Sequence, residues 1–226
     1  MKSSFRMAAA GALLAATAFT PAMAQNFLTG PTGYQAGNVL VRLGLIGVIP
    51  QNMGSAVTVP GANLTLEGTH VHASSTVTPE IDASYFLTPH ISFELIAATS
   101  RHNVWVEGGA LPKTKVGSVW VLPPTLTAQY HFAQFDGIRP YAGVGLTVAF
   151  FYGTSPAAGF SSTGYSTAVG PTLDAGFDVP VRGNWSVNVD VKQMFITTAA
   201  HVNHGTIHAL TELDPTVVRL GIGYKF

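Results

Sequence analysis

The chain has 226 residues, a length typical of a single domain. Eleven basic and eleven acidic residues cancel to a formal net charge of zero, which argues against a nucleic-acid-binding protein, because such proteins carry a basic excess. Hydrophobic residues make up 47% and charged residues only 10%, whereas soluble domains carry about 25% charged residues, and the absence of cysteine excludes disulfides and thiol chemistry.

The first residues have the pattern of a secretory signal peptide. Two basic residues precede an uncharged apolar stretch, Met7–Phe19, and Ala22-Met23-Ala24 supplies the small residues of a cleavage site. A membrane-spanning helix needs about 20 apolar residues, and Pro21 ends this run too early. We therefore expect residues 1–24 to be a signal peptide and residues 25–226 to form the exported domain.

The exported part alternates apolar and polar residues in segments of strand length. In Asn184–Phe195 the apolar residues Trp185, Val187, Val189 and Val191 alternate with polar ones, so the two sets lie on opposite faces of a strand. Segments of this kind begin near Gly37, Thr76, His90, Val116, Arg139, Tyr165, Asn184 and Val218. Single-chain bacterial barrels have an even number of strands. The sequence predicts an all-β fold, an eight-stranded antiparallel transmembrane β-barrel.

The connections between these segments alternate in length. Residues 88–90, 133–137 and 182–184 are tight turns with Pro, Gly or Asp, whereas residues 50–75, 100–115, 153–164 and 198–209 are longer and rich in Gly, Ser, Thr or His. Outer-membrane barrels have short periplasmic turns and longer extracellular loops. Both chain ends of the barrel therefore belong on the periplasmic side.

Charged residues fall on one stripe of the predicted strands. The set assigned to the interior, or lumen, is Arg42, Glu80, Asp82, Glu94, Asp174, Asp178, Asp190, Lys192, Arg219 and Lys225. A soluble β-sandwich gives the same alternation with the two faces reversed. Aromatic residues near the strand ends favour the membrane barrel, where they form girdles at the two interfaces. Tyr224 and Phe226 resemble the C-terminal signal that such barrels present to the barrel-assembly machinery.

Six apolar residues share the inward stripe: Leu40, Ile46, Phe86, Ile96, Tyr141 and Met194. We expect the charges to pair lower in the barrel and close it, and these six to line a hydrophobic pocket nearer the loops. The alternative is that they only fill the interior, since small barrels are packed with side chains.

Pro123 and Pro124 interrupt the fourth predicted strand. Proline cannot donate to a β-ladder, so the pair removes one hydrogen bond on each side. One interpretation is a weak point in the wall through which a hydrophobic solute leaves sideways into lipid. The other is that the pair simply marks the start of the strand.

Histidines of the outer loops raise the question of a metal site. His201, His204 and His208 lie in the last loop, but their spacing matches no recognised ligand pattern, so we predict no metal or cofactor. The close His/Ser pairs, His90–Ser92 and His72–Ser74, lack a third orienting group, so we predict no enzyme.

Several motifs resemble the OmpW family of outer-membrane proteins, which includes the AlkL-type alkane-uptake proteins. They are residues 87–101, the LPPT of residues 122–125 with its continuation to Phe132, the RPYAGVG of residues 139–145, and residues 213–226. The resemblance implies an eight-stranded barrel that passes small hydrophobic molecules. Ile96 matches an apolar lumen position of the family, whereas Lys192 stands where some members have a large aromatic residue.

Together these observations predict a protein of the bacterial outer membrane that passively takes up small hydrophobic solutes. Its expected partners are membrane lipid, those solutes and the barrel-assembly machinery, with no nucleic acid. The alternative is a structural or adhesive barrel, or receptor, whose extracellular loops bind a surface partner.

Overall fold

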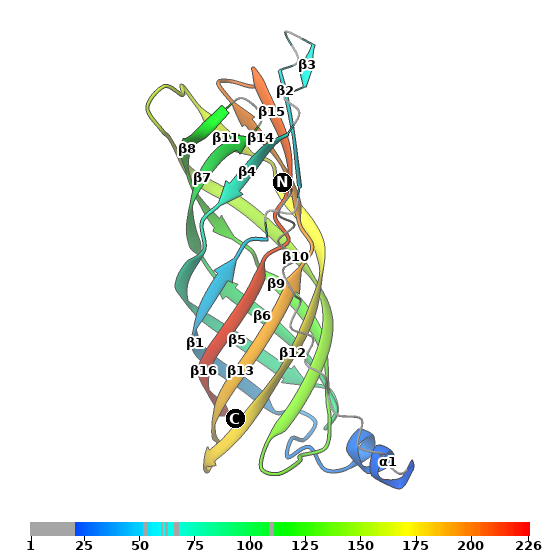
Figure 1. The fold of residues 1–226 in the computed structure, drawn as a ribbon. Helices are drawn as coiled ribbons and strands as arrows, with labels where there is room; N and C mark the ends of the chain where they lie inside the picture. Colours follow the sequence, from blue (N-terminus) through cyan, green and yellow to red (C-terminus); the bar gives the residue numbers. More distant parts are fainter. Residues whose placement is uncertain (1–20, 52–53, 60, 62, 66–67, 109–110) are drawn as a thin grey trace, which may run out of the picture.

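Eight strands close into an antiparallel barrel (Figure 1). The structure, a computed structural model, describes residues 21–51, 54–59, 61, 63–65, 68–108 and 111–226. The barrel strands are β1 (Val39–Ile49), β5 (Thr76–Phe86), β6 (Ile91–Ala98), β9 (Thr125–His131), β10 (Arg139–Pro156), β12 (Ala168–Arg182), β13 (Trp185–Met194) and β16 (Thr216–Lys225). Each pairs with the next, and β16 pairs back to β1. The predicted eight-stranded barrel is confirmed.

A short helix, α1 (Pro21–Thr29), lies beside the end of the barrel that carries the C-terminus (Figure 1). Most of the predicted signal peptide, residues 1–20, lies outside the described residues. Within the described part of the chain, no helix has both the length and the apolar character that a transmembrane helix requires.

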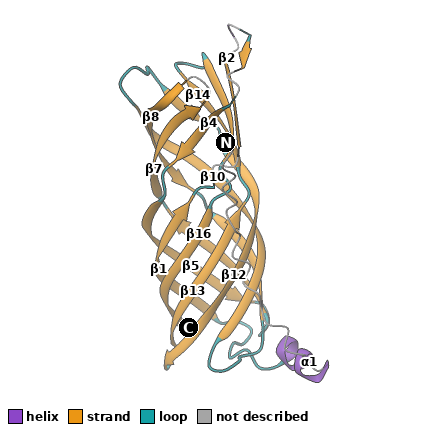
Figure 2. Cartoon of the chain, in the orientation of Figure 1, coloured by secondary structure: helices purple, strands orange, loops and turns teal. Residues whose placement is uncertain are grey.

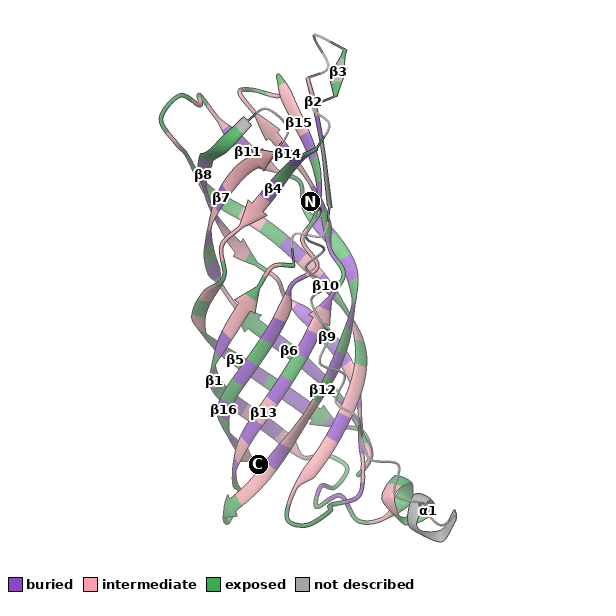
Figure 3. Ribbon diagram, in the orientation of Figure 1, coloured by how far each residue is buried: buried purple, intermediate pink, exposed green. Residues whose placement is uncertain are grey.

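Burial alternates along the barrel strands, as Figure 3 shows by its alternating colours. The inward side chains of Arg42, Glu94 and Lys192 are buried, whereas outward Val144, Leu146 and Leu220 are 60–63% exposed. A water-soluble sandwich would bury the second set instead. The faces are therefore those of a membrane barrel, with apolar side chains toward lipid.

Exposed aromatic residues mark the two ends of this apolar surface. Tyr85, Trp185 and Phe226 lie toward the C-terminal end, and Phe150 and Phe195 lie toward the opposite end. Aromatic girdles of this kind sit at the interfaces between lipid and water.

The predicted outer loops are largely β-structure that extends the barrel on the side opposite the C-terminus (Figure 2). Their strands are β2 (Gly54–Val59), β3 (Leu64–Thr65), β4 (Thr69–Ala73), β7 (Ser100–Gly108), β8 (Leu111–Leu122), β11 (Thr163–Tyr165), β14 (Thr197–Val202) and β15 (Ile207–Glu212). β10 continues past the barrel and pairs with β8, β8 pairs with β7, and β7 with β4. These segments form strands because one face is buried: Val71, Val104, Val119, Ala200 and Ala209 pack in one cluster.

Orientation of the strands can be tested with two outward valines of nearly equal exposure. Val144, at mid-strand in β10, is 62% exposed, and Val181, beside the turn after β12, is 66% exposed. We expect Val144→Arg to lower the free energy of unfolding by about 2–4 kcal/mol and Val181→Arg by about 0–1 kcal/mol, because the penalty for arginine peaks at the bilayer midplane. Urea unfolding in lipid vesicles measures both. Equal effects of the two substitutions would contradict the assignment of faces.

Candidate functional site: an apolar pocket above an ionic plug

Nine buried charged residues fill the middle of the barrel, and we call this group the ionic plug: Arg42, Lys192, Arg219, Glu80, Asp82, Glu94, Asp174, Asp178 and Asp190. Arg42 donates two parallel hydrogen bonds to Asp178, from Nε to Oδ1 at 3.0 Å and from Nη2 to Oδ2 at 2.8 Å. Its Nη1 donates to Asp82 Oδ1 at 3.0 Å and lies 3.3 Å from Glu94 Oε2. Such two-pronged, charge-assisted bonds fix side-chain geometry.

The other two cations complete the network. Lys192 Nζ lies 2.8 Å from Glu94 Oε1, 2.9 Å from Asp174 Oδ1 and 3.2 Å from Asp190 Oδ1. Arg219 Nη1 bonds Glu80 Oε1 at 3.1 Å and also Asp82, while its Nε donates to Asn188 Oδ1 at 2.9 Å.

Strand register explains why these charges meet. Arg42 lies directly opposite Asp82, Asp174 opposite Lys192, and Asp190 opposite Arg219 on neighbouring strands. Opposed side chains on one face have Cβ atoms about 4.5–5.5 Å apart, close enough to pair. The period-two pattern of each strand therefore assembles the plug once the barrel closes.

A second layer closes the barrel below the plug. Tyr34, from the segment before β1, stacks on Phe86 with 4.3 Å between ring centroids, and both contact Leu40. Tyr34 Oη donates to Asp178 Oδ2 at 2.9 Å, which ties this layer to the plug. Sequence reasoning missed Tyr34 because it precedes the first strand and follows no alternating pattern.

The placement of Leu40, Phe86 and Tyr141 in the predicted pocket is wrong. Leu40 and Phe86 lie near the C-terminal end of the barrel, beneath the plug, because β1 begins and β5 ends there. Tyr141 lies inside the plug, where its Oη donates to Asp190 Oδ2 at 2.9 Å.

Above the plug an apolar pocket opens toward the β-extension. Ile46, Ile96 and Met194, three of the predicted residues, line it. Val119, Val121, Phe151, Ile196 and Val217 complete much of the wall, and Glu80, Asp190, Lys192 and Arg219 form the floor. Sequence reasoning did not name Phe151, although alternation along β10, in which the neighbouring Phe150 is exposed, points its side chain inward.

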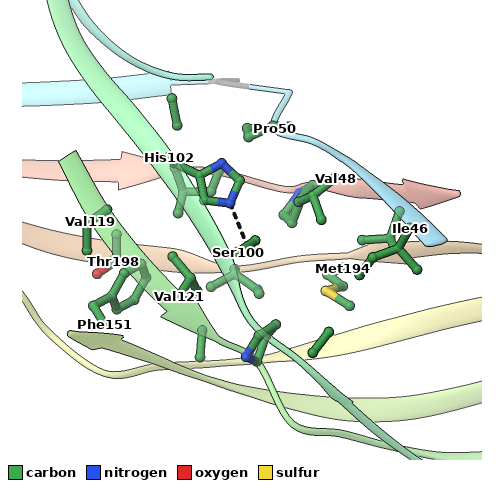
Figure 4. A pocket seen from close by; sticks show the side chains of 18 of the residues that line it. Ile46, Val48, Pro50, Ser100, His102, Val119, Val121, Phe151, Met194 and Thr198 are labelled. Atoms are coloured by element: carbon green, nitrogen blue, oxygen red, sulfur yellow. Dashed lines mark hydrogen bonds between the residues drawn. The ribbon is translucent and has the colours of Figure 1, made fainter. Parts of the chain in front are cut away.

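Few polar side chains interrupt the upper wall. Ser100, His102, Thr198 and Thr211 line it, and Figure 4 shows the hydrogen bond between Ser100 and His102 among the apolar side chains. Burial lowers the pKa of His102 below its usual value and raises the pKa of Tyr165, also in the wall, to about 12. Both groups are therefore neutral near pH 7.

Pro123 and Pro124 lie at an interruption in the wall. The β6–β9 ladder ends at the Ile96–Thr125 pair, and the β7–β8 ladder starts, in the same register, at the Ser100–Val121 pair. No ladder pair joins residues 97–99 to residues 122–124, all of them described. On the side of β10, Val148 N donates to the Pro124 carbonyl at 3.0 Å. Neighbouring residues of a strand direct their backbone polar groups to opposite sides, so Pro123 is turned toward the gap, and proline has no N–H to donate there. Pro123 also lines the pocket.

Lys225 does not belong to the plug, contrary to the prediction. It occupies the last position of β16, at the C-terminal end of the barrel, where its Nζ donates to the Gly33 carbonyl at 3.1 Å. Alternation pointed it inward correctly, but among the described residues it bonds a backbone carbonyl and forms no ion pair.

The remaining predicted residues have simple placements. Tyr224 contacts Trp185 edge to face, and the Phe226 N–H donates to the Val39 carbonyl at 2.8 Å, so the chain end helps to join β16 to β1. His201 and His208 face each other across β14 and β15, with 4.7 Å between ring centroids. Within the described residues, no three His, Cys, Asp or Glu side chains are grouped as a metal site requires.

Comparison with known proteins identifies the family. The profile of the OmpW family matches residues 35–226. The chain belongs to the OmpW family. An uncharacterised outer-membrane protein of Sinorhizobium fredii, y4mB, is 38% identical over 189 residues, which is 82% of this chain and 79% of that protein.

Two further members of the family support this assignment. Outer membrane protein W of Escherichia coli K12 is 32% identical over 152 residues, covering 63% of this chain and 70% of that protein. The crystal structure of OprG from Pseudomonas aeruginosa superposes with a TM-score of 0.79 and 28% identity, covering 86% of this chain and 98% of that one. This OmpW-family chain is thus an outer-membrane β-barrel.

The ionic plug can be tested with two lysine substitutions. We expect Lys192→Met to lower the free energy of unfolding by about 3–5 kcal/mol, because buried Asp174 loses its cation and Glu94 and Asp190 each lose one of theirs. Lys113→Met is the control: Lys113 lies 3.8 Å from Glu107 on the surface, where ion pairs contribute about 0–1 kcal/mol. Urea unfolding in lipid vesicles compares them, and a Lys192 variant as stable as the Lys113 variant would contradict the plug.

Proposed function

We propose that this barrel takes up small hydrophobic solutes from the extracellular side and releases them sideways into the outer membrane. The observation that carries the proposal is an apolar pocket whose floor is a closed ionic plug. Ligand pockets are typically apolar with a few placed polar groups, which describes this pocket. An adhesive barrel has no need of such a cavity, so the pocket favours uptake.

The plug argues against passage straight through the barrel. An apolar solute moving down the axis would have to break the bonds that Arg42, Lys192 and Arg219 make with buried carboxylates. Breaking a buried pair leaves an uncompensated charge at a cost of several kcal/mol. Below the plug, the stacked Tyr34 and Phe86 rings present a second barrier.

The interruption at Pro123 offers a route with a lower barrier. Ala98, Val121 and Pro123 border it and also line the pocket, so pocket and wall gap are adjacent. A solute leaving there crosses apolar side chains and breaks no backbone ladder pair. The proline pair also directly precedes β9, so in this proposal it both starts a strand and weakens the wall.

Export and assembly belong to the same proposal. Cleavage after Ala24 would release the chain for insertion, and Tyr224 and Phe226 would present β16 to the barrel-assembly machinery. Because β16 pairs with β1 in the finished barrel, its edge is free only before closure.

A substitution in the pocket tests uptake. We expect Ile96→Asp to reduce uptake of a labelled long-chain alkane at least tenfold. An alkane that enters the pocket would remove water from the new carboxylate, and burying an unpaired charge costs free energy. Cells carrying each variant in a lipopolysaccharide-covered outer membrane provide the measurement, with Ile96→Leu as the volume-matched control. Unchanged uptake by a folded Ile96→Asp barrel would refute the pocket's role.

A second pair of variants tests lateral release. Restoring the missing N–H groups by the double substitution Pro123→Ala, Pro124→Ala should allow the ladder to close and slow uptake severalfold, with solute binding retained. Pro180→Ala is the control, since Pro180 is a strand proline remote from the pocket, at the other end of β12. If the double variant takes up alkane as fast as the Pro180 variant, release occurs elsewhere.

A further inference from the structure

Ser100 and His102 form an oriented pair in the wall of the pocket. They alternate along β7, so both side chains lie on its inner face, and each is about 95% buried. Ser100 Oγ lies 2.8 Å from His102 Nε2, and His102 Nδ1 lies 2.6 Å from the Ser74 carbonyl oxygen. Figure 4 shows the first of these bonds inside the apolar pocket.

These contacts fix where the protons are. A carbonyl oxygen only accepts hydrogen bonds, so His102 Nδ1 carries the proton and donates it to Ser74. In a neutral imidazole the other nitrogen, Nε2, is then an acceptor, and Ser100 must be its donor. Burial lowers the pKa of His102, which is consistent with the neutral ring.

The outcome is a hydrogen-bond acceptor facing apolar surroundings. Ser100 has one hydroxyl proton and gives it to His102, so its oxygen offers only lone pairs to anything in the pocket. Thr211, on β15, supplies a second polar group. Its Oγ1 atom is buried, lines the same pocket and has no hydrogen-bond partner among the described residues.

We propose that the pocket selects solutes with an apolar body and one terminal hydrogen-bond donor, such as medium-chain aliphatic alcohols, whose hydroxyl donates to Ser100 Oγ. Thr211 provides a second polar contact within the same pocket. This inference rests on the proposed uptake function and narrows its substrate class from hydrocarbons in general to amphiphiles that carry a donor.

This arrangement gives solutes of equal size different affinities for the pocket. A ketone has only acceptor atoms, so it gains nothing from Ser100 unless Ser100 abandons His102 and leaves a buried nitrogen unpaired. The Thr211 hydroxyl can donate to a ketone and to an alcohol alike, so the discrimination between these two rests on Ser100. An alkane makes no polar contact at all. One added hydrogen bond in a buried site corresponds to an affinity difference of about threefold to tenfold.

The test compares the binding of 1-octanol, 2-octanone and n-octane to the full chain in lipid nanodiscs. Shifts of the Ile46, Ile96 and Met194 methyl NMR signals report occupancy of the pocket. In the unmodified barrel we expect 1-octanol to bind about threefold to tenfold more tightly than either of the other two. Each ligand partitions into lipid equally for every variant. The ratio of a ligand's apparent affinities for two variants therefore reports the contribution of the protein alone.

In Ser100→Ala the preference over 2-octanone should fall to about one, and in Ser100→Thr, which keeps the hydroxyl, it should persist. A smaller preference for 1-octanol over n-octane should remain in Ser100→Ala because of Thr211, and adding Thr211→Val should remove it. Ser92→Ala is the matched control, because Ser92 Oγ also lies within hydrogen-bond distance of a histidine Nε2, that of His131 at 2.9 Å, outside the pocket. It should leave the preference intact.

Each other result overturns the inference. If Ser100→Ala keeps the octanol preference over 2-octanone, the donor binds elsewhere, for example at Glu80 in the floor. If nitrogen-15 NMR shows the His102 proton on Nε2, the acceptor role of Ser100 is wrong. Equal binding of all three ligands refutes the selectivity but leaves the uptake function standing, whereas no binding of any of them refutes the uptake function as well.

Discussion

The membrane requires every backbone polar group to find its partner within the protein, and the rest of this structure depends on that requirement. A closed ladder of eight strands satisfies it along the barrel, and the interruption at Pro123 lies at the end of the barrel where the extension begins. Closure of the barrel also determines which environment each of a strand's two faces meets. The apolar face meets lipid, and the charged face is confined to an interior so narrow that the side chains must pair with one another.

Along the barrel axis the interior is layered. Stacked Tyr34 and Phe86 lie at the end where the chain terminates, the ionic plug lies next, and the apolar pocket follows toward the β-extension. The layers follow from position along each strand, since Leu40, Arg42 and Ile46 share one face of β1 at increasing distance from its start. A single strand thus contributes to all three layers.

The β-extension gives the pocket its upper walls. β7 and β8 continue the barrel strands β6 and β9 in the same register across the interruption at Pro123, so the wall gap lies where barrel and extension meet. Family membership establishes the fold and the membrane. What the barrel binds is a matter of the particular side chains in the pocket, because one fold serves many functions.

Alternation alone was enough to predict the eight strands, the outward valines and leucines, and the inward charges such as Arg42 and Lys192, because a strand's two faces are a local property. Alternation did not determine the position of a side chain along the barrel axis. Leu40, Phe86 and Tyr141 point inward as expected, but strand register places them below or inside the plug. Tyr34, Phe151 and the Ser100–His102 pair reach their partners only through closure of the barrel and stacking of the extension. Those contacts join residues far apart in the chain, so no local pattern specifies them.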